Sequence, residues 1–385
     1  MHYSFGVYSE FVIFEETTTF PTILKFIIRL EQLIPYRKKD KWGYCTPDKK
    51  IVIDCIYDDA EVFSEGLALV TINGEGLFFI DRNNKIVIPK FEFGIPDSFF
   101  GGLAKITRIN EKGIFSYTYI DIQGRVILPF VNKLNNFSED LASFSSNNKF
   151  GFINRLGQIV IPCLFEVFYE NQRYCVGKFS EGLCSIKIKN HWCYINKMGG
   201  IELICDFDNV GDFSEGIAIA RKNNKWGFID KKGIVVIPFQ YDMVHGSFSE
   251  GLTAVRIRER YGFINNVDET VIPFEYRHAG HFSEGLVYLQ NDNDLWGFIN
   301  KTNDIVIPFQ FDELRAFSEG LAIFRCRDKW GYINMDGEIV IPSKFDIAKP
   351  FSNGLAEIEN NYGIHNYDSY KSGYINKSGD QYWED

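Results

Sequence analysis

The chain has 385 residues, of which 45% are hydrophobic and 24% are charged. This is enough apolar material for a continuous core, and it excludes extensive disorder. The net charge of -10 excludes a sequence-independent grip on nucleic acid, because such binding needs a surplus of Lys and Arg to displace phosphate counterions. The 36 Phe and 20 Tyr favour strands over helices, since large rigid rings suit pleated sheets.

The first expected element is a short helix over residues 20–34. Four polar side chains would form a stripe along it: Thr22, Lys25, Arg29 and Gln32. We expect residues 1–36 to form an N-terminal segment whose amphipathic helix caps the open end of the array; docking to a partner or to a membrane surface is the alternative. The run is too short and too charged for a transmembrane segment, and no signal peptide precedes it, so we expect a cytoplasmic location.

From residue 37 onward, one motif recurs at intervals of 34 to 42 residues, a period typical of tandem repeats. The motif reads FSEGL or a variant of it. Its nine copies begin at Phe63, Phe99, Phe137, Phe179, Phe213, Phe248, Phe282, Phe317 and Phe351. Each unit continues with a variable strand, a polar turn, WGFID or a relative, a second turn and IVIP. We therefore predict three strands in each unit.

The turn residues support this prediction. The fourth position of FSEGL is Gly in eight of nine copies, which favours a tight bend. In nine copies the third residue after WGFID is Gly, Asn or Asp, the types that tolerate a positive φ, so WGFID and IVIP should pair antiparallel. The first copy reads TPDK (residues 46–49), so we expect its hairpin to be distorted or to cap the end of the array. IVIP lacks polar alternation, which predicts a strand covered on both faces by neighbouring repeats.

Three segments carry a resemblance to a known family: KWGFIDKKG (residues 225–233), IVIPFQFDE (residues 305–313) and FSEGLA (residues 317–322). They resemble the bacterial WG-repeat, or KWG-repeat, family over roughly residues 40 to 380. The resemblance implies a set of interaction modules within residues 37–385. We divide them into drifted repeats at 37–212, regular repeats at 213–365 and a terminal cap at 366–385.

The number of repeats bears on the architecture. Nine units exceed the roughly four to eight blades typical of closed propellers. We therefore predict an all-β repeat protein in which tandem three-stranded antiparallel units form an open or superhelical, propeller-like array.

Two repeated side chains have both a structural and a functional interpretation. The tryptophans favour core packing, and the alternative is a ladder of exposed rings that binds sugars, peptides or bases; they are Trp42, Trp192, Trp226, Trp296 and Trp330. The glutamates are expected to satisfy backbone amides at the bend, and the alternative is a carboxylate row that attracts cations or a basic partner; they are Glu65, Glu139, Glu181, Glu215, Glu250, Glu284 and Glu319.

No residue pattern predicts catalysis. The repeated Ser residues are not accompanied by a base, and no nucleophile, phosphate-loop or zinc-protease motif is present. His278 and His281 have a metal-compatible separation but no accompanying ligand, and the eight cysteines, which form no CxxC pair, should be buried reduced thiols. We therefore expect no enzyme, no catalytic or metal residues and no cofactor. An enzyme that uses an unrecognised cleft is the remaining alternative.

Two places break the period and are the candidate binding loops, since insertions in repeats often lie on a binding face. One spans residues 168–178, with Tyr169, Arg173 and Tyr174, and the other spans residues 366–371, with Tyr367 and Tyr370. We predict a non-catalytic scaffold that mediates protein–protein interaction through its repeat surface and these loops. The alternative is a glycan- or polymer-binding protein that uses the periodic aromatic residues. The partner is an unidentified macromolecule in either case.

Overall fold

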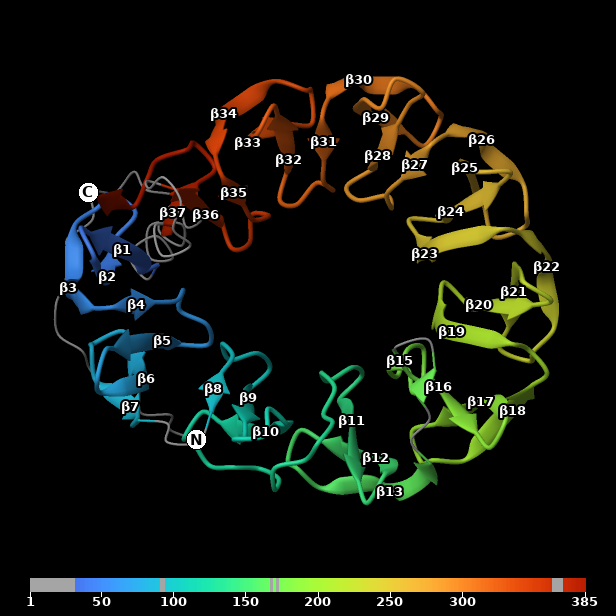
Figure 1. Cartoon of the computed structure of the whole chain (residues 1–385), viewed down its shortest axis with the longest axis horizontal. Coiled ribbons are helices and arrows are strands. Elements are labelled where there is room, and N and C mark those ends of the chain that lie inside the picture. Colours follow the sequence, from blue (N-terminus) through green and yellow to red (C-terminus); the bar gives the residue numbers. More distant parts are fainter. Residues whose placement is uncertain (1–31, 91–93, 167–168, 171–172, 362–369) are drawn as a thin grey trace, which may run out of the picture.

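The computed structural model describes residues 32–90, 94–166, 169–170, 173–361 and 370–385. In this part of the chain the regular structure is entirely β. The strands form ten small sheets, here called blades 1 to 10 in chain order, and one additional hairpin. The blades follow one another around a ring (Figure 1). The prediction of an all-β protein built from tandem antiparallel units is confirmed.

A complete blade has four antiparallel strands, as blade 6 shows. Its strands run from β19 at the inner rim of the ring to β22 at the outer rim (Figure 1). The three predicted strands are present, and the short inner strand is an addition. In blade 9 this inner strand has only two residues, too few to produce a hydrophobic period.

The first five blades and the extra hairpin contain the following strands: β1 (Ile34–Lys38), β2 (Lys41–Cys45) and β3 (Ile51–Tyr57) in blade 1; β4 (Asp59–Ala60), β5 (Leu67–Ile72), β6 (Gly76–Asp81) and β7 (Ile86–Ile88) in blade 2; β8 (Ile95–Pro96), β9 (Leu103–Ile109) and β10 (Phe115–Asp121) in blade 3; β11 (Leu141–Ser146), β12 (Lys149–Asn154) and β13 (Ile159–Glu166) in blade 4; β14 (Tyr169–Glu170) and β15 (Arg173–Tyr174) in the hairpin; β16 (Leu183–Ile188), β17 (His191–Asn196) and β18 (Ile201–Cys205) in blade 5.

The second five blades contain β19 (Asn209–Ser214), β20 (Ile217–Lys222), β21 (Lys225–Asp230) and β22 (Val235–Tyr241) in blade 6; β23 (Met243–Ser249), β24 (Leu252–Ile257), β25 (Arg260–Ile264) and β26 (Thr270–Tyr276) in blade 7; β27 (His278–Ala279), β28 (Leu286–Gln290), β29 (Trp296–Asn300) and β30 (Ile305–Phe311) in blade 8; β31 (Glu313–Leu314), β32 (Leu321–Cys326), β33 (Lys329–Asn334) and β34 (Ile339–Phe345) in blade 9; β35 (Ile347–Ala348), β36 (Leu355–Asn361) and β37 (Tyr370–Asn376) in blade 10, followed by β38 (Trp383–Glu384).

The FSEGL motif forms a two-residue hairpin turn between the inner strand and the next strand. In blade 9, Ser318 and Leu321 exchange both backbone hydrogen bonds, at 2.9 and 3.2 Å. The two central residues, Glu319 and Gly320, have φ of 54° and 82°. Positive φ at both positions defines the turn type whose twist matches a β-hairpin. The predicted bend is confirmed, and its Glu is left-handed as well as its Gly.

The second predicted turn is also confirmed. Its nine Gly, Asn and Asp residues have φ between 62° and 83°, and they are Asn84, Gly124, Gly157, Gly199, Gly233, Asp268, Asn303, Gly337 and Gly379. The expected distortion of the first copy is wrong, because Lys49 takes the same position at φ 64°. The Thr46 amide still bonds to the carbonyl of Lys50 at 2.9 Å.

The expectation that IVIP is covered on both faces is wrong. In β34 only the third residue of the run, Ile341, is buried, whereas Ile339 and Val340 are 57% and 37% exposed. Successive residues of a strand point to opposite faces, so both faces of β34 are exposed at its first two residues, where the strand lies at the outer rim of the ring (Figure 1). The same pattern of two exposed residues and one buried residue recurs in β3, β7, β13, β22 and β26.

The hydrophobic core lies between blades. At nine successive junctions, an aromatic ring of the WGFID strand packs against the Phe that begins the next FSEGL motif, with ring centroids 4.7 to 5.2 Å apart. Tyr332 with Phe351 joins blades 9 and 10 in this way. A single blade therefore leaves one aromatic face without cover.

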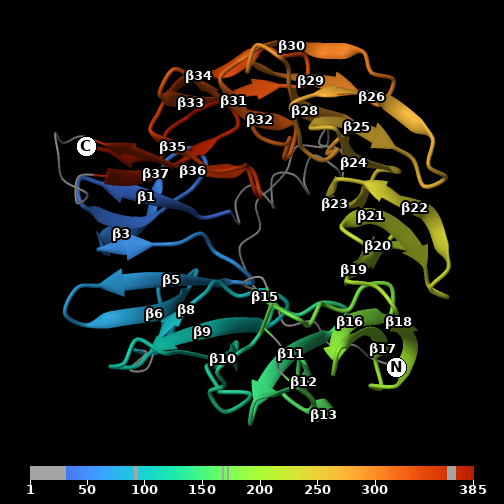
Figure 2. The same cartoon turned by 45° about the vertical axis from the view of Figure 1, so that its right-hand side comes forward.

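The ring is closed, which corrects the expectation of an open or superhelical array. After bridging to blade 10 through Gln381 and Ile375, the chain continues into β38, which pairs parallel with β1 of blade 1. Figures 1 and 2 both show blade 10 beside blade 1. Residues 381–385 of the predicted terminal cap thus join the two ends.

Two sequence-based boundaries also change. The count of nine repeats rested on the FSEGL motif, whereas blade 1 has no such motif among the described residues, and the ring contains ten blades. The predicted helix lies outside the described residues up to position 31. Its last residue, Ile34, begins strand β1, so the boundary placed after residue 36 falls within a strand.

Buried Arg37 holds the closure together. Its guanidinium donates to the carbonyl of Ser372 at 3.0 Å and pairs with the Asp385 carboxylate at 2.8 Å. Tyr36 donates to Glu384 at 2.7 Å.

We predict that removing residues 381–385 opens the ring. The deletion takes away β38 and removes the carboxylate that pairs with Arg37; because the Asp385 side chain is 43% exposed, loss of this ion pair costs less than the roughly 3–5 kcal/mol of a fully buried pair. The melting temperature should fall, and the maximum dimension in small-angle X-ray scattering should rise. Asp385→Ala keeps β38 and should have a smaller effect. Scattering and melting equal to those of the full chain would contradict closure.

Candidate functional site

The two candidate loops lie on blades half a ring apart. Around residues 169–174, β14 and β15 form a hairpin in which Tyr169 pairs with Tyr174. Figure 1 shows β15 at the inner rim beside blade 5. On blade 10, Tyr370 begins β37 and pairs with Asn361, whereas Tyr367 lies outside the described residues. The structure does not bring the two loops together, and their role in binding stays a prediction.

The repeated serines join neighbouring blades. At seven junctions the Ser hydroxyl donates to the carbonyl of the next FSEGL phenylalanine, at 2.5 to 3.1 Å. Ser318, for example, donates to Phe351 at 2.8 Å. These hydroxyls are engaged in the structure of the ring, and sequence analysis missed the contact because it joins residues about 35 positions apart.

The repeated glutamates act at the same seven junctions. Each carboxylate accepts a hydrogen bond from one or two amides of the next FSEGL turn, at 2.6 to 3.4 Å. Glu319 accepts from both Asn353 and Gly354. The structural interpretation is confirmed, with the refinement that the amides belong to the next blade. We call this Ser and Glu pair the latch.

Lysines reinforce four of the latches. They come from the WGFID turn of the receiving blade and lie 3.0 to 3.2 Å from the carboxylate: Lys197 on Glu139, Lys231 on Glu181, Lys301 on Glu250 and Lys377 on Glu319. Partial burial alone would raise the pKa of Glu181, but the amide of Gly216 and the ammonium of Lys231 hold it below its usual range. The pKa of Glu139, Glu250 and Glu319 is lowered in the same manner.

The tryptophan series contributes to the core. Trp42, Trp192 and Trp330 are less than 10% exposed, and Trp226 and Trp296 are half-buried. The guanidinium of Arg315 lies 4.6 Å from the centre of the Trp330 ring. The core-packing interpretation is confirmed. The ladder of exposed rings loses three of its five members.

The remaining questions from the sequence concern a histidine metal site, a membrane-spanning helix and the cysteines. His278 lies between the rings of Tyr261 and Trp296, with centroids 6.4 and 6.2 Å away. Within the described residues, no three His, Cys, Asp or Glu side chains form a group able to hold a metal, and no helix has the length and apolar character to cross a membrane. All eight cysteines are free thiols. Five are buried as expected, whereas Cys326 is exposed.

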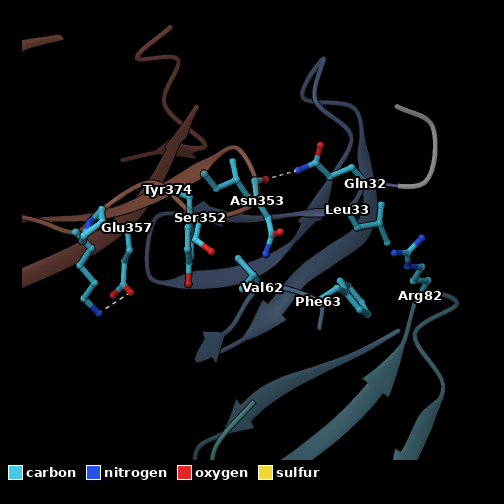
Figure 3. Close-up of a pocket in the computed structure, with 12 residues that line it drawn as sticks. Gln32, Leu33, Val62, Phe63, Arg82, Ser352, Asn353, Glu357 and Tyr374 are labelled. Carbon is cyan, nitrogen blue, oxygen red and sulfur yellow. Dashed lines mark hydrogen bonds and ion pairs between the residues drawn. The ribbon is translucent and has the colours of Figure 1, made fainter. Parts of the chain in front are cut away.

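A cavity of about 300 Å³ lies at the seam where the ring closes, between blades 10, 1 and 2. Figure 3 shows Arg82 on one side of it, Glu357 on the other, and Tyr374 and Val62 between them. We call this space the seam cavity. Its lining residues are Gln32, Leu33, Val62, Phe63, Arg82, Lys349, Pro350, Ser352, Asn353, Leu355, Glu357 and Tyr374.

The two sides of the seam cavity differ in charge compensation. On the blade 10 side, Lys349 lies 2.7 Å from Glu357, which raises the pKa of the lysine. On the blade 2 side, Arg82 has no carboxylate partner among the described residues. Sequence analysis missed the cavity because three segments distant in the chain line it. The available signal was the lack of an FSEGL motif before β1: Leu33 precedes the strand, but Arg29 stands where the other units have Phe.

The repeat family follows from the sequence match. The model of the WG containing repeat matches residues 42–75, 117–150, 150–192, 192–226, 226–261, 261–293, 296–330 and 330–362. The chain belongs to the WG-repeat family. No curated protein matches this WG-repeat chain at the level of sequence.

Several solved structures are similar to this WG-repeat protein at low identity. A structure titled as the eukaryotic initiation factor is 11% identical, with 91% of this chain and 94% of that chain covered and a TM-score of 0.48. BamB from Moraxella catarrhalis is 10% identical, with 69% and 95% covered and a TM-score of 0.34. The WD40 β-propeller domain of Doa1 is 10% identical, with 89% and 96% covered and a TM-score of 0.30.

The latches should make the stability of the ring depend on pH. The folded pKa of Glu181 and Glu250 lies below the unfolded value of about 4.3. The ionised latches therefore stabilise the fold above about pH 4.3, and this contribution is lost as the pH falls through the folded pKa.

We predict that Glu181→Gln combined with Glu250→Gln lowers the free energy of unfolding at pH 7, and with it the melting temperature. The loss should be less than about 2 kcal/mol, because the carboxylates are partly solvated. The further loss of stability between pH 5 and pH 3, measured by thermal melting, should be smaller than in the original chain. Gln at Glu166 and Glu275, two exposed glutamates outside the latches, is the control. Parallel curves for all three proteins would refute the role of the carboxylates.

Proposed function

We propose that this protein is a non-catalytic scaffold that binds another protein along its outer rim. The observation that carries the proposal is the exposed aliphatic row at that rim. In blade after blade the first two residues of the outermost strand are Ile or Val facing solvent, as Ile305 in β30 and Ile339 in β34 are at 60% and 57% exposure. Repeated apolar exposure of this extent is typical of surfaces that contact another protein.

The backbone of the rim supports the same proposal. Each outermost strand has a neighbour on one side only, so part of its N–H and C=O groups faces outward. A partner strand can add to such an edge, with side-chain pockets giving specificity. The Pro that ends each IVIP run limits this pairing to a few residues.

The engagement of the repeated polar groups supports the non-catalytic part of the proposal. The Ser and Glu residues that recur in seven of the nine FSEGL copies are engaged in latches between blades. Their hydroxyls and carboxylates are thus held by backbone groups of a neighbouring blade. A cytoplasmic location belongs to the same proposal. No observation favours glycan binding, since most of the indole rings face the core.

We predict that Ile305→Lys combined with Ile339→Lys weakens capture of the partner by about tenfold or more, because two apolar contacts are replaced by charges. The measurement is affinity capture with the full chain, followed by titration of the recovered partner. Asn293→Lys combined with Asn266→Lys adds the same charge at exposed polar positions in turns outside the outermost strands and should leave capture unchanged. Equal affinity for the rim variant and the original chain would refute the rim as the contact surface.

A further inference from the structure

The latch defines a receiving site that recurs around the ring. Its parts are the amides of the two central residues of an FSEGL turn and, in four blades, a lysine from the WGFID turn of the same blade. In blade 10 these parts are Asn353, Gly354 and Lys377, and they bind the Glu319 carboxylate at 2.6, 3.0 and 3.2 Å. The chain thus contains its own examples of how this site binds a carboxylate.

Blade 2 has the same parts, and no carboxylate of the described residues is bound to them. Glu65 and Gly66 have φ of 53° and 85°, which matches the turns that receive a latch. Arg82 stands at the position of the lysines, one residue after the WGFID strand of its blade. Among the described residues, no carboxylate accepts from these two amides or pairs with Arg82. A guanidinium with two aligned amides is a strong carboxylate receptor.

Blade 4 provides an internal contrast. Its equivalent arginine, Arg155, pairs with Asp140 at 3.0 Å and donates to the carbonyl of Gly101 at 3.0 Å. The arginine of blade 4 is therefore engaged within the ring, whereas Arg82 of blade 2 faces the seam cavity (Figure 3).

The seam cavity presents further groups that are engaged at other junctions. Ser352 is equivalent to Ser318, which donates to the next phenylalanine carbonyl. Tyr374 is equivalent to Tyr332, which packs on Phe351 and donates to the carbonyl of Lys349 at 2.8 Å. Within the described ranges, neither the Ser352 nor the Tyr374 hydroxyl has a hydrogen-bond partner. The cavity thus offers a ring for an aromatic side chain, a hydroxyl for a carbonyl and a receptor for a carboxylate.

The size of the cavity fits this ligand. About 300 Å³ equals the share of roughly ten water molecules in liquid water, which is enough for an aromatic side chain. Apolar walls from Val62, Phe63 and Leu355 surround this space. Glu357 is compensated by Lys349, whereas Glu61 and Asp59 also raise the pKa of Tyr374, so the carboxylate of the ligand is placed on the Arg82 side of the cavity.

We propose that the seam cavity binds an acidic peptide segment of a partner protein, in which a Glu follows a Phe by two positions. The Glu carboxylate binds the amides of Glu65 and Gly66 and the guanidinium of Arg82. The Phe ring packs on Tyr374, and its carbonyl accepts from Ser352. The peptide thereby completes at the seam the contact that the FSEGL motif makes at seven other junctions.

The sequence before β1 does not supply this motif. Residues 29–33 read Arg-Leu-Glu-Gln-Leu where the repeats read Phe-Ser-Glu-Gly-Leu, so Phe, Ser and Gly are missing. Glu31 is the one acidic residue that matches in register. The experiment therefore has to separate a partner carboxylate from that of Glu31.

The test is isothermal titration calorimetry of the full chain with the blocked peptide acetyl-Phe-Ser-Glu-amide, which ends before the register that Gln32 and Leu33 occupy, and with its Glu→Gln version. We expect saturable binding of the first peptide and about tenfold or greater weakening for the second. Arg82→Gln should weaken binding to the same extent, and Tyr374→Phe, which keeps the ring, should weaken it less. Arg155→Gln, at the matched position of blade 4, should leave binding unchanged.

Three outcomes would overturn the proposal. The first is the absence of saturable binding, and the second is equal weakening by Arg82→Gln and Arg155→Gln. The third is binding that is seen only in Glu31→Gln, which would mean that the Glu31 carboxylate of the chain itself occupies the receptor. Melting temperatures of the variants show whether each is folded. The site lies apart from the outer rim, so its failure leaves the proposed rim contact untouched.

Discussion

The structure depends on the contact between consecutive blades at the FSEGL turn. A blade of three or four short strands has one aromatic face that its own residues do not cover, as Tyr332 shows by packing on Phe351 of the next blade. Hydrophobic burial is the largest favourable contribution to folding, so a blade gains it only with a neighbour in place. Stability is therefore shared around the ring, and the turn that starts each blade also fixes its distance from the previous one.

The glutamate of the turn illustrates how this spacing is achieved. A left-handed conformation at a non-Gly residue costs on the order of 1–2 kcal/mol, and Gly or Asn would adopt it at lower cost. Hydrogen bonds to a charged group contribute about 1.5–3 kcal/mol, less when solvent screens them. These two quantities nearly cancel. Glu319 therefore adds little net stability, and its main effect is to fix the register of the next blade.

Closure of the ring changes the structural role of the first and last blades. In an open array, terminal units need polar caps, whereas here β38 covers the free edge of β1 and buried Arg37 joins them. The junction is not a copy of the others, because β38 takes the place of the inner strand in blade 1 and pairs parallel, whereas the inner strands of the other blades pair antiparallel. Among the described residues, groups that are engaged at the other junctions, such as those of Ser352 and Tyr374, line the seam cavity here.

The sequence by itself determined the local structure. Gly, Asn and Asp at fixed offsets predicted both turns correctly, since positive φ is a property of the single residue. The bulk retained at the WGFID aromatic positions predicted that Trp42 and Trp330 belong to the core. The period of the motif predicted tandem units, and the family match agrees with it.

Only the tertiary structure decided how the units meet. Closure depends on the rotation between successive blades, which accumulates around the ring and leaves no local signature, so nine motifs did not predict ten blades in a ring. The exposure of Ile339 depends on which strand lies at the edge, and β34 lies at the outer one. The pairing of Arg37 with Asp385, and the seam cavity, join opposite ends of the chain. A repeat period in the sequence predicts contacts that recur in every unit, so it cannot predict contacts that occur once in the ring.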